Sequence, residues 1–284
     1  MEKNLSFQHM AGRVCVITGG GGMIGSALAF GFASVGVRMV IVDLIRTNAE
    51  GLAESLRREF GVDALGVEGD VLEKGSMEHA LEEIAARFGG INMLVNCAGG
   101  NSPSATTKEE YVMKENVSHL EDTFYGLDVE GFRKVFDLNF LGTIIPTMVF
   151  TRGMVANMDG AVLNISSMNA FRPLTRIPAY SAAKASINNF TEWLAVHLAK
   201  VNIRVNGIAP GFFLTNQNRF LLVDEKTGMM TERGKKILSG TPMGTFGAPA
   251  DLQGAALFLM SDMAKFITGV TIPVDGGFNA FSGV

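Results

Sequence analysis

The chain has 284 residues, of which 47% are hydrophobic and 18% charged, and its formal net charge is −4. This balance excludes a disordered chain, and the lack of a basic run argues against nucleic acid or a polybasic membrane patch as a partner. The first residues lack the apolar core of a signal peptide, and no apolar run reaches the ~20 residues of a membrane span. Cys15 and Cys97 lie in apolar, strand-like runs. We expect both thiols to be buried and reduced, which favours a cytoplasmic protein.

A glycine-rich turn follows the first predicted strand. Residues 13–18 form a β-branched apolar run, segment 19–25 carries five glycines, and a helical stretch begins at Ser26. This context is typical of a phosphate-binding loop, because glycines allow close approach to a pyrophosphate and the helix N-terminus carries positive partial charge. A flexible loop is the alternative, and the ordered apolar flanks disfavour it.

The second predicted strand, residues 37–43, ends in an acid, Asp43. A carboxylate at this strand tip is placed to accept hydrogen bonds from an adenosine ribose. It would repel the additional phosphate of NADP, so the expected cofactor is NAD, although Arg38 and Arg46 could weaken that preference. The alternative role for Asp43 is a helix N-cap.

Strands and helices then alternate along the chain. We predict helices over 47–60 and 73–88 and strands over 62–69 and 91–96. Alternation of this kind predicts an α/β fold with a doubly wound parallel sheet of about seven strands and helices on both faces. Ligands of such sheets bind at the carboxyl ends of the strands, and several polar or glycine residues fall at predicted strand ends: Gly19, Asp43, Asp70, Asn96 and Ser167.

The second half opens with a polar excursion over 101–127, which either borders the active site or is a surface loop without a role. A helix over 128–157 follows, in which Gly142 and Pro146 predict an irregularity. The remaining predicted elements are strands at 161–165, 203–208 and 270–275 and helices at 179–200 and 249–260, and the mixed segment 212–247 is a candidate mobile cover. No linker is apparent, so we predict a single domain over 1–284, with a dinucleotide-binding half (12–100) and a catalytic half (128–284).

Tyr180 and Lys184 are four residues apart on the predicted helix 179–200, which places both side chains on one face. A neighbouring ammonium stabilises a phenolate and lowers its pKa toward the range useful for proton transfer. Such a pair is common by chance, so its neighbours decide the interpretation.

Together these residues resemble the short-chain dehydrogenases/reductases. The resemblance runs from about Arg13 to Asp275, and its motifs in this sequence are Thr18-Gly19 with Gly25, Asp70-Val71, Asn96-Cys97-Ala98-Gly99, Asn139, Ser167, Tyr180-Ser181-Ala182-Ala183-Lys184, and Pro210-Gly211 with Thr215. The spacing to Tyr180 selects Ser167 rather than Ser166. The resemblance implies a Rossmann-type fold and an NAD(P)-dependent dehydrogenase or reductase acting on CH–OH groups.

The resemblance also implies roles for single residues. Tyr180 would transfer the proton, Lys184 would lower the pKa of Tyr180 and hold the nicotinamide ribose, Ser167 would hold the substrate oxygen, and Asn139 would keep a water in place. Cofactor contacts are expected from Gly19, Gly22, Met23, Ile24, Asp43, Asp70, Val71, Asn96, Ala98, Gly99, Tyr180, Lys184, Pro210, Gly211, Phe213 and Thr215. No metal is expected.

Two positions depart from the family pattern. Met23 replaces a usual glycine, so Gly22 would make the close approach to the phosphate, and Cys97 replaces a usual asparagine.

A narrower resemblance, to the D-mannonate oxidoreductases (fructuronate reductases) and gluconate 5-dehydrogenase-like members, rests on segments 101–127, 166–171, 209–215 and 274–278. It implies interconversion of D-mannonate and D-fructuronate. A sugar acid needs a cation for its carboxylate and polar groups for its hydroxyls.

The substrate contacts that we expect are Asn101, Ser167, Asn169, Arg172 and Tyr180. Arg176 and Arg219 are further cation candidates, although a solvated surface position is favoured for both. A polyol, a sugar or a 3-oxoacyl group is the alternative substrate, and a regulatory protein without chemistry is disfavoured by the intact catalytic set. The family also implies a homotetramer.

Overall fold

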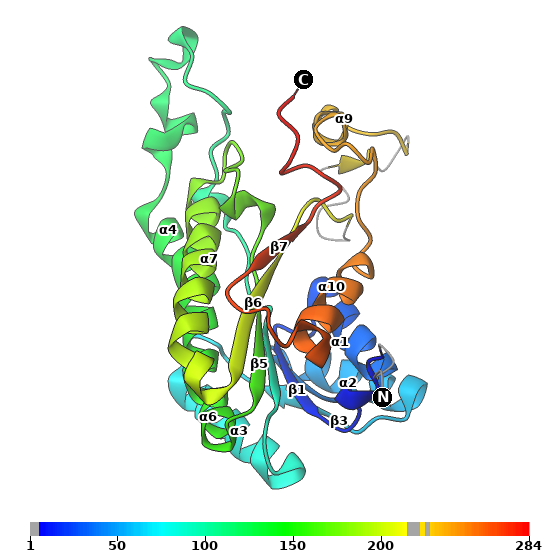
Figure 1. The fold of residues 1–284 in the computed structure, drawn as a ribbon. Coiled ribbons are helices and arrows are strands. Elements are labelled where there is room, and N and C mark those ends of the chain that lie inside the picture. Colours follow the sequence, from blue (N-terminus) through cyan, green and yellow to red (C-terminus); the bar gives the residue numbers. More distant parts are fainter. Residues whose placement is uncertain (1–5, 215–221, 225–227, 284) are drawn as a thin grey trace.

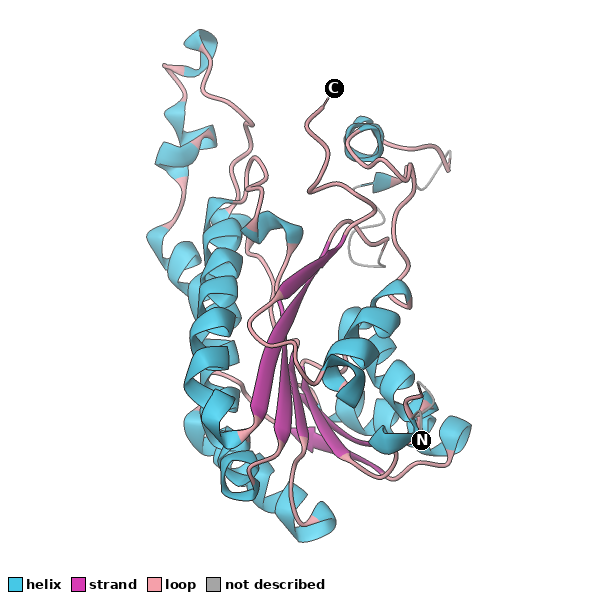
Figure 2. Cartoon of the chain, in the orientation of Figure 1, coloured by secondary structure: helices cyan, strands magenta, loops and turns pink. Residues whose placement is uncertain are grey.

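A computed structural model describes residues 6–214, 222–224 and 228–283. A seven-stranded sheet in the order β3-β2-β1-β4-β5-β6-β7 forms the centre of the molecule (Figures 1 and 2). All neighbouring strands are parallel. The strands are β1 (Val14–Thr18), β2 (Arg38–Asp43), β3 (Ala64–Glu68), β4 (Met93–Asn96), β5 (Gly160–Ile165), β6 (Ile203–Pro210) and β7 (Thr271–Val274). The predicted doubly wound α/β fold is therefore confirmed.

Helices cover both faces of this sheet (Figure 1). One face packs against α1 (Met23–Ser34), α2 (Arg46–Phe60) and α10 (Asp251–Met260). The other packs against α3 (Lys74–Phe88), α5 (Gly142–Phe150), α6 (Arg152–Asn157) and α7 (Pro178–Leu198). β1 and β4 are buried along their whole length, which is why both read as continuous apolar runs. In the parts of the chain that the structure describes, no helix is both long and apolar enough to cross a bilayer.

The chain order places the ligand site. From β1 the chain passes outward to β2 and β3, and from β4 it continues on the opposite side of β1 toward β7. The crevice between the carboxyl ends of β1 and β4 is therefore the point where the strand order reverses, which is where such sheets bind ligands.

Helix α1 begins at Met23, earlier than the predicted start at Ser26. Gly22 is extended (φ −72°, ψ 164°) and occupies the N-cap position, so the turn ends there. Met23 and Ile24 consequently belong to the first helical turn, whose free backbone N–H groups can face an anion.

The predicted helix 128–157 is divided in the structure. It consists of α4 (Val129–Phe136), a π-helical turn (Asp137–Leu141), α5 and α6, so the expected irregularity lies immediately before Gly142. Pro146 lies inside α5 without interrupting it. A π-helical turn inside a helix is frequent at functional sites, and this one carries Asn139.

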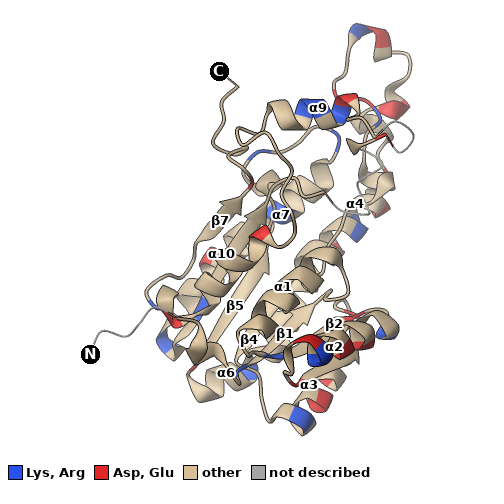
Figure 3. Ribbon diagram, turned by 90° about the vertical axis from the view of Figure 1, so that its right-hand side faces the viewer, with Lys and Arg blue, Asp and Glu red and all other residues tan. Residues whose placement is uncertain are grey.

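The excursion 101–127 rises beyond the carboxyl ends of the strands (Figure 1). It holds short 3₁₀ turns at Pro103–Ala105, Lys114–Asn116, Leu120–Asp122 and Phe124–Gly126. Opposite it rises α9 (Glu232–Ser239) from the expected cover 212–247. Figure 3 shows charged residues on α9 and the excursion, while the central strands are largely uncharged.

Candidate active site

A cleft of about 700 Å³ opens at the carboxyl ends of β1, β2, β4, β5 and β6. Volumes of this size are typical of small-molecule and cofactor sites. Most of the predicted site residues line it: Gly19, Gly22, Met23, Ile24, Asp43, Asp70, Val71, Ala98, Gly99, Asn101, Ser167, Tyr180, Lys184, Pro210, Gly211 and Phe213. Thr215 and Arg219 lie outside the described residues.

The glycine turn packs so closely that side chains are excluded. Gly19 has φ +61°, and a Cβ there would lie 2.7 Å from Cα of Ala98. A Cβ on Gly25 would lie 2.6 Å from the carbonyl oxygen of Gly19. This close packing holds the turn against the N-terminus of α1, so its residues fit the predicted pyrophosphate cradle.

Asp43 closes the cleft at the tip of β2. Its Oδ2 accepts a hydrogen bond from the backbone N–H of Gly21 at 3.0 Å, and Oδ1 accepts from Ile45 N at 3.0 Å. The N-cap position of α2 is Ile45, so the alternative role of Asp43 as that cap is wrong. Asp43 instead joins the glycine turn to the second strand and presents a carboxylate to the cleft.

Asn96 does not reach the cleft lining. Its Nδ2 donates to Thr147 Oγ1 at 2.8 Å and to Asn164 Oδ1 at 2.9 Å. These bonds lie on the face of the sheet that packs against α5. Side chains alternate along a strand, so Asn96 shares the face of Leu94. Its side chain therefore links β4, β5 and α5, and the segment after it reaches the cleft through Cys97, Ala98 and Gly99.

Asn139 also lies outside the cleft lining and is fully buried. Its Oδ1 accepts from Gly100 N at 3.2 Å, and its Nδ2 donates to Gly100 O at 2.7 Å and Val135 O at 2.8 Å. The side chain thus clamps the loop after β4 behind Lys184. Its expected role in holding a water stays a prediction.

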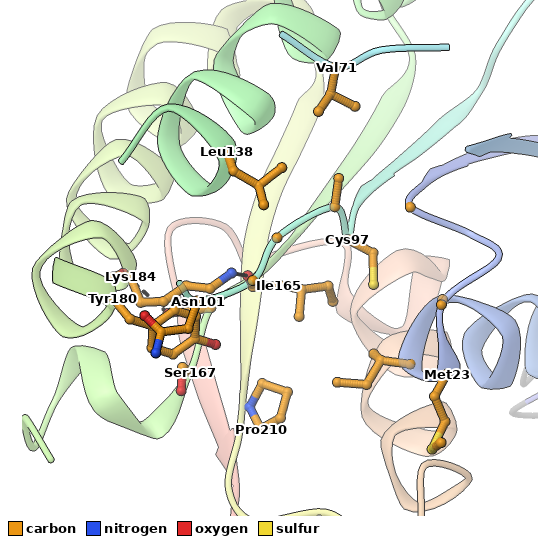
Figure 4. Close-up of a pocket in the computed structure, with 18 of the residues that line it drawn as sticks. Met23, Val71, Cys97, Asn101, Leu138, Ile165, Ser167, Tyr180, Lys184 and Pro210 are labelled. Atoms are coloured by element: carbon orange, nitrogen blue, oxygen red, sulfur yellow. Dashed lines mark hydrogen bonds between the residues drawn. The ribbon is translucent and has the colours of Figure 1, made fainter. Parts of the chain in front are cut away.

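Ser167, Tyr180 and Lys184 lie together on one side of the cleft, with Asn101 beside them (Figure 4). The Ser167 hydroxyl lies near enough to the Tyr180 hydroxyl to lower the pKa of the phenol. The Lys184 ammonium donates to the carbonyl oxygen of Ile165 at 2.9 Å and lies 5.7 Å from the centroid of the Tyr180 ring. These contacts follow from the end of β5, which delivers Ser167, and from the helical spacing of Tyr180 and Lys184 on α7.

Burial is the main influence on the pKa of Tyr180 and of Lys184. Burial raises the pKa of the Tyr180 hydroxyl and outweighs the lowering by Ser167. The expected lowering of this pKa by Lys184 stays a prediction. Burial also lowers the pKa of Lys184 to about 8.

Two predicted substrate residues lie outside the lining of the cleft. Asn169 is buried and its Oδ1 has no hydrogen-bond partner, while its backbone N–H donates to Ser167 Oγ at 3.2 Å. Arg172 is exposed, and its Nε donates to Asn279 O at 2.7 Å. Arg172 therefore tethers the C-terminal segment.

Sequence reasoning missed several lining residues: Leu44, Leu138, Ile165, Ile177 and Phe212, and it placed Cys97 only as a packing residue. Leu138 lies in the π-helical turn, and residue propensities do not predict such a turn. Burial raises the pKa of the Cys97 thiol to about 12, so it stays protonated and acts as a small apolar wall.

Comparison with known proteins identifies the family of the chain. The profile described as enoyl-(acyl carrier protein) reductase matches residues 21–279. The oxidoreductase UxuB of Bacillus subtilis, described as uncharacterized, is 44% identical over 278 residues, which cover 98% of each chain. The chain belongs to the short-chain dehydrogenase/reductase family. It is an oxidoreductase, and the family's cofactor is NAD(P).

Two solved structures are informative about ligands. One, from Haemophilus influenzae and provisionally named a D-mannonate oxidoreductase with bound NAD, is 43% identical, has a TM-score of 0.92 and covers 98% of this chain and 99% of its own. A gluconate 5-dehydrogenase from Burkholderia cenocepacia, in complex with NADP and tartrate, is 30% identical, has a TM-score of 0.81 and covers 95% of this chain and 96% of its own.

Proposed function

We propose that the chain interconverts a secondary alcohol and a ketone of a sugar acid with NAD, and that the substrate pair is D-mannonate and D-fructuronate. Two observations support this proposal: the likeness to the Haemophilus protein over the full length, and the grouping of Ser167, Tyr180 and Lys184 in one cleft. The tartrate in the gluconate 5-dehydrogenase shows that a hydroxy acid binds a relative.

The cofactor supplies hydride transfer when it is bound. Tyr180 is placed to take the proton from the alcohol, or to return it to the ketone, because its hydroxyl lies in the cleft beside Ser167. Ser167 Oγ accepts from Asn169 N, and its own hydrogen, which lowers the pKa of Tyr180 in the protein alone, would turn to the substrate oxygen as charge develops there. The cation of Lys184 is held against the tyrosine ring by the carbonyl of Ile165.

Preference for NAD over NADP rests on Asp43. Its carboxylate lines the cleft at the tip of β2, where the adenosine ribose would lie. The 2′-phosphate of NADP would meet this charge, whereas the two hydroxyls of NAD could donate to it.

A homotetramer and a cytoplasmic location also belong to the proposal. Apolar side chains are exposed along α5 and α7, among them Met148, Trp193 and Val196. This surface is compatible with subunit contact. The free thiols of Cys15 and Cys97 are compatible with a reducing compartment.

The test is turnover by the purified chain of D-mannonate, D-gluconate and neutral polyols with NAD and NADP, and of 3-oxoacyl thioesters with NADH and NADPH, followed by absorbance of the reduced cofactor. We expect the highest kcat/KM with D-mannonate and NAD. Turnover confined to neutral or acyl substrates would exclude the sugar-acid assignment.

Replacement of Tyr180 tests the chemistry. Tyr180→Phe should lower kcat by roughly 10²- to 10⁴-fold, as loss of a general acid–base does, while the Kd of NADH changes little. Tyr125→Phe, the same substitution on a 71%-exposed side chain of the excursion, should leave both unchanged. Full activity in Tyr180→Phe would contradict the assigned role.

A further inference from the structure

Arg176 lies between the segment that carries Ser167 and the helix that carries Tyr180, and its backbone is unusual. Its φ is +74°, one of three positive values at non-glycine positions in the described residues. This left-handed conformation is strained for an arginine, because its Cβ crowds the backbone there. The carbonyl oxygen of Arg176 accepts from the N–H of Thr107 at 2.8 Å, so the excursion fixes this turn.

The guanidinium of Arg176 is equally unusual. Arg176 is half-buried, and its Nε is buried without a hydrogen-bond partner. Arg172, by contrast, donates to a backbone carbonyl. Burial of a charged donor without a partner is unfavourable, and a carboxylate matches the planar fork of a guanidinium. The sequence-based preference for a solvated surface position at Arg176 is therefore wrong.

The charges around Arg176 are mostly positive. Lys236 of α9 forms an ion pair with Glu110 of the excursion at 2.5 Å. The pKa of Glu110 is lowered first by this hydrogen bond, and the charges of Arg176 and Arg233 lower it further. Lys236, Arg176 and Arg233 thus act on one carboxylate, where the excursion and α9 rise beyond the same end of the sheet (Figures 1 and 3). This excess of positive charge favours a second anion.

Arg176 is also within reach of the reacting centre. Ile177, the next residue, lines the cleft. Arg176 and Tyr180 are four positions apart in the chain, so their Cα atoms are at most about 14 Å apart. A long arginine side chain and a six-carbon acid can span such a distance.

We propose that Arg176 binds the carboxylate of the substrate and so selects sugar acids over neutral sugars. This inference rests on the proposed function and assigns its carboxylate site. Arg176 itself does not line the cleft, so the guanidinium would meet the carboxylate at the mouth, beside Ile177, where the turn is held by Thr107.

Arg176→Gln is the principal test, with D-mannonate as substrate and tartrate as a non-reacting probe. We expect a roughly ten- to hundredfold higher KM for D-mannonate, the range for loss of a charged hydrogen-bonded pair, and an equal loss of tartrate affinity for the NADH complex by calorimetry. The kcat and the Kd of NADH should change less than about threefold. Arg152→Gln, the same charge change on the exposed surface of α6, should match the wild type.

Arg176→Gly separates binding from folding. Glycine adopts the left-handed turn without strain, so this variant should unfold at no lower temperature than the wild type and yet show the raised KM of Arg176→Gln. Arg176→Lys should recover part of the affinity, because it keeps the charge and loses the bidentate fork.

The outcomes separate the two proposals. Suppose that the wild type turns over D-mannonate and that Arg176→Gln has a KM and a tartrate affinity within twofold of the wild-type values. This result would overturn the role of Arg176 and leave the proposed function intact. A wild type that turns over only neutral substrates would overturn the proposed function. In that case tartrate titration still tests the role of Arg176. Tartrate that binds the wild type and not Arg176→Gln supports the carboxylate site, and a wild type that does not bind tartrate refutes it.

Discussion

A single methyl group at Gly99 should disturb the catalytic centre. A Cβ at this position would lie 2.7 Å from Asn139 Oδ1 and 3.1 Å from Lys184 Nζ. The backbone of Gly99 does not have a positive φ, so alanine is compatible with its conformation and only the contacts change. The buried amide of Asn139 must move away from the methyl group.

The cost follows from what that amide holds. It makes three hydrogen bonds, two with the backbone of Gly100 and one with Val135 O, at 2.7–3.2 Å. Each contributes about 0.5–1.5 kcal/mol net, so weakening two or three of them lowers the free energy of unfolding by about 1–4 kcal/mol. For domains of this order of size, each kcal/mol lowers Tm by about 2–4 °C.

The assay is thermal and urea unfolding of Gly99→Ala together with kcat and the Kd of NADH. Gly100→Ala is the matched control, because its Cβ would meet only Leu138 Cδ2 at 3.6 Å, an ordinary contact. We expect Gly99→Ala to lose both stability and kcat and Gly100→Ala to lose little of either. Equal stability and activity in the two variants would refute the reasoning.

The cofactor and the buried lysine give two more predictions. Asp43→Asn keeps a hydrogen-bond acceptor near Gly21 N and removes the charge, so the ratio of kcat/KM for NADPH over NADH should rise at least about tenfold; an unchanged ratio would exclude Asp43 as the discriminating group. The pKa of Lys184 is lowered from 10.5 to about 8 by burial, so the native state binds fewer protons than the unfolded state between these values. This lysine should therefore make stability rise with pH by about 1 kcal/mol per pH unit across that window. Urea unfolding of the wild type and Lys184→Met at pH 7, 8, 9 and 10 measures the difference, and parallel curves would contradict it.

Local patterns are enough for much of the cleft. The glycine turn, the acid at the end of β2 and the Tyr180–Lys184 pair depend on contacts within a few residues, where spacing and backbone preference decide the geometry. The residues at the ends of the predicted strands therefore include most of the residues that line the cleft, among them Asp43 and Ser167. The alternation of strands and helices likewise predicted the parallel sheet.

The errors arose where a side chain's direction depends on its neighbours. Asn96 falls at a strand tip like the other site residues, but its register with Asn164 points it toward α5. The pKa of Tyr180 depends on the burial of its hydroxyl, and the spacing between Tyr180 and Lys184 in the sequence carries no information about that burial. Arg176 looks like a surface arginine in the sequence, and only the excursion and α9 make it half-buried among like charges.

By itself, then, the sequence determined the sheet, the glycine turn and the Tyr180–Lys184 pair, because these arise from the period of helices and strands and from the few residue types that a tight turn accepts. The tertiary structure alone decided which polar side chains enter the cleft, how burial shifts their proton affinities and where an arginine meets the excursion. Those properties depend on segments distant in sequence, such as Thr107 and Arg176, that become neighbours only when the chain packs.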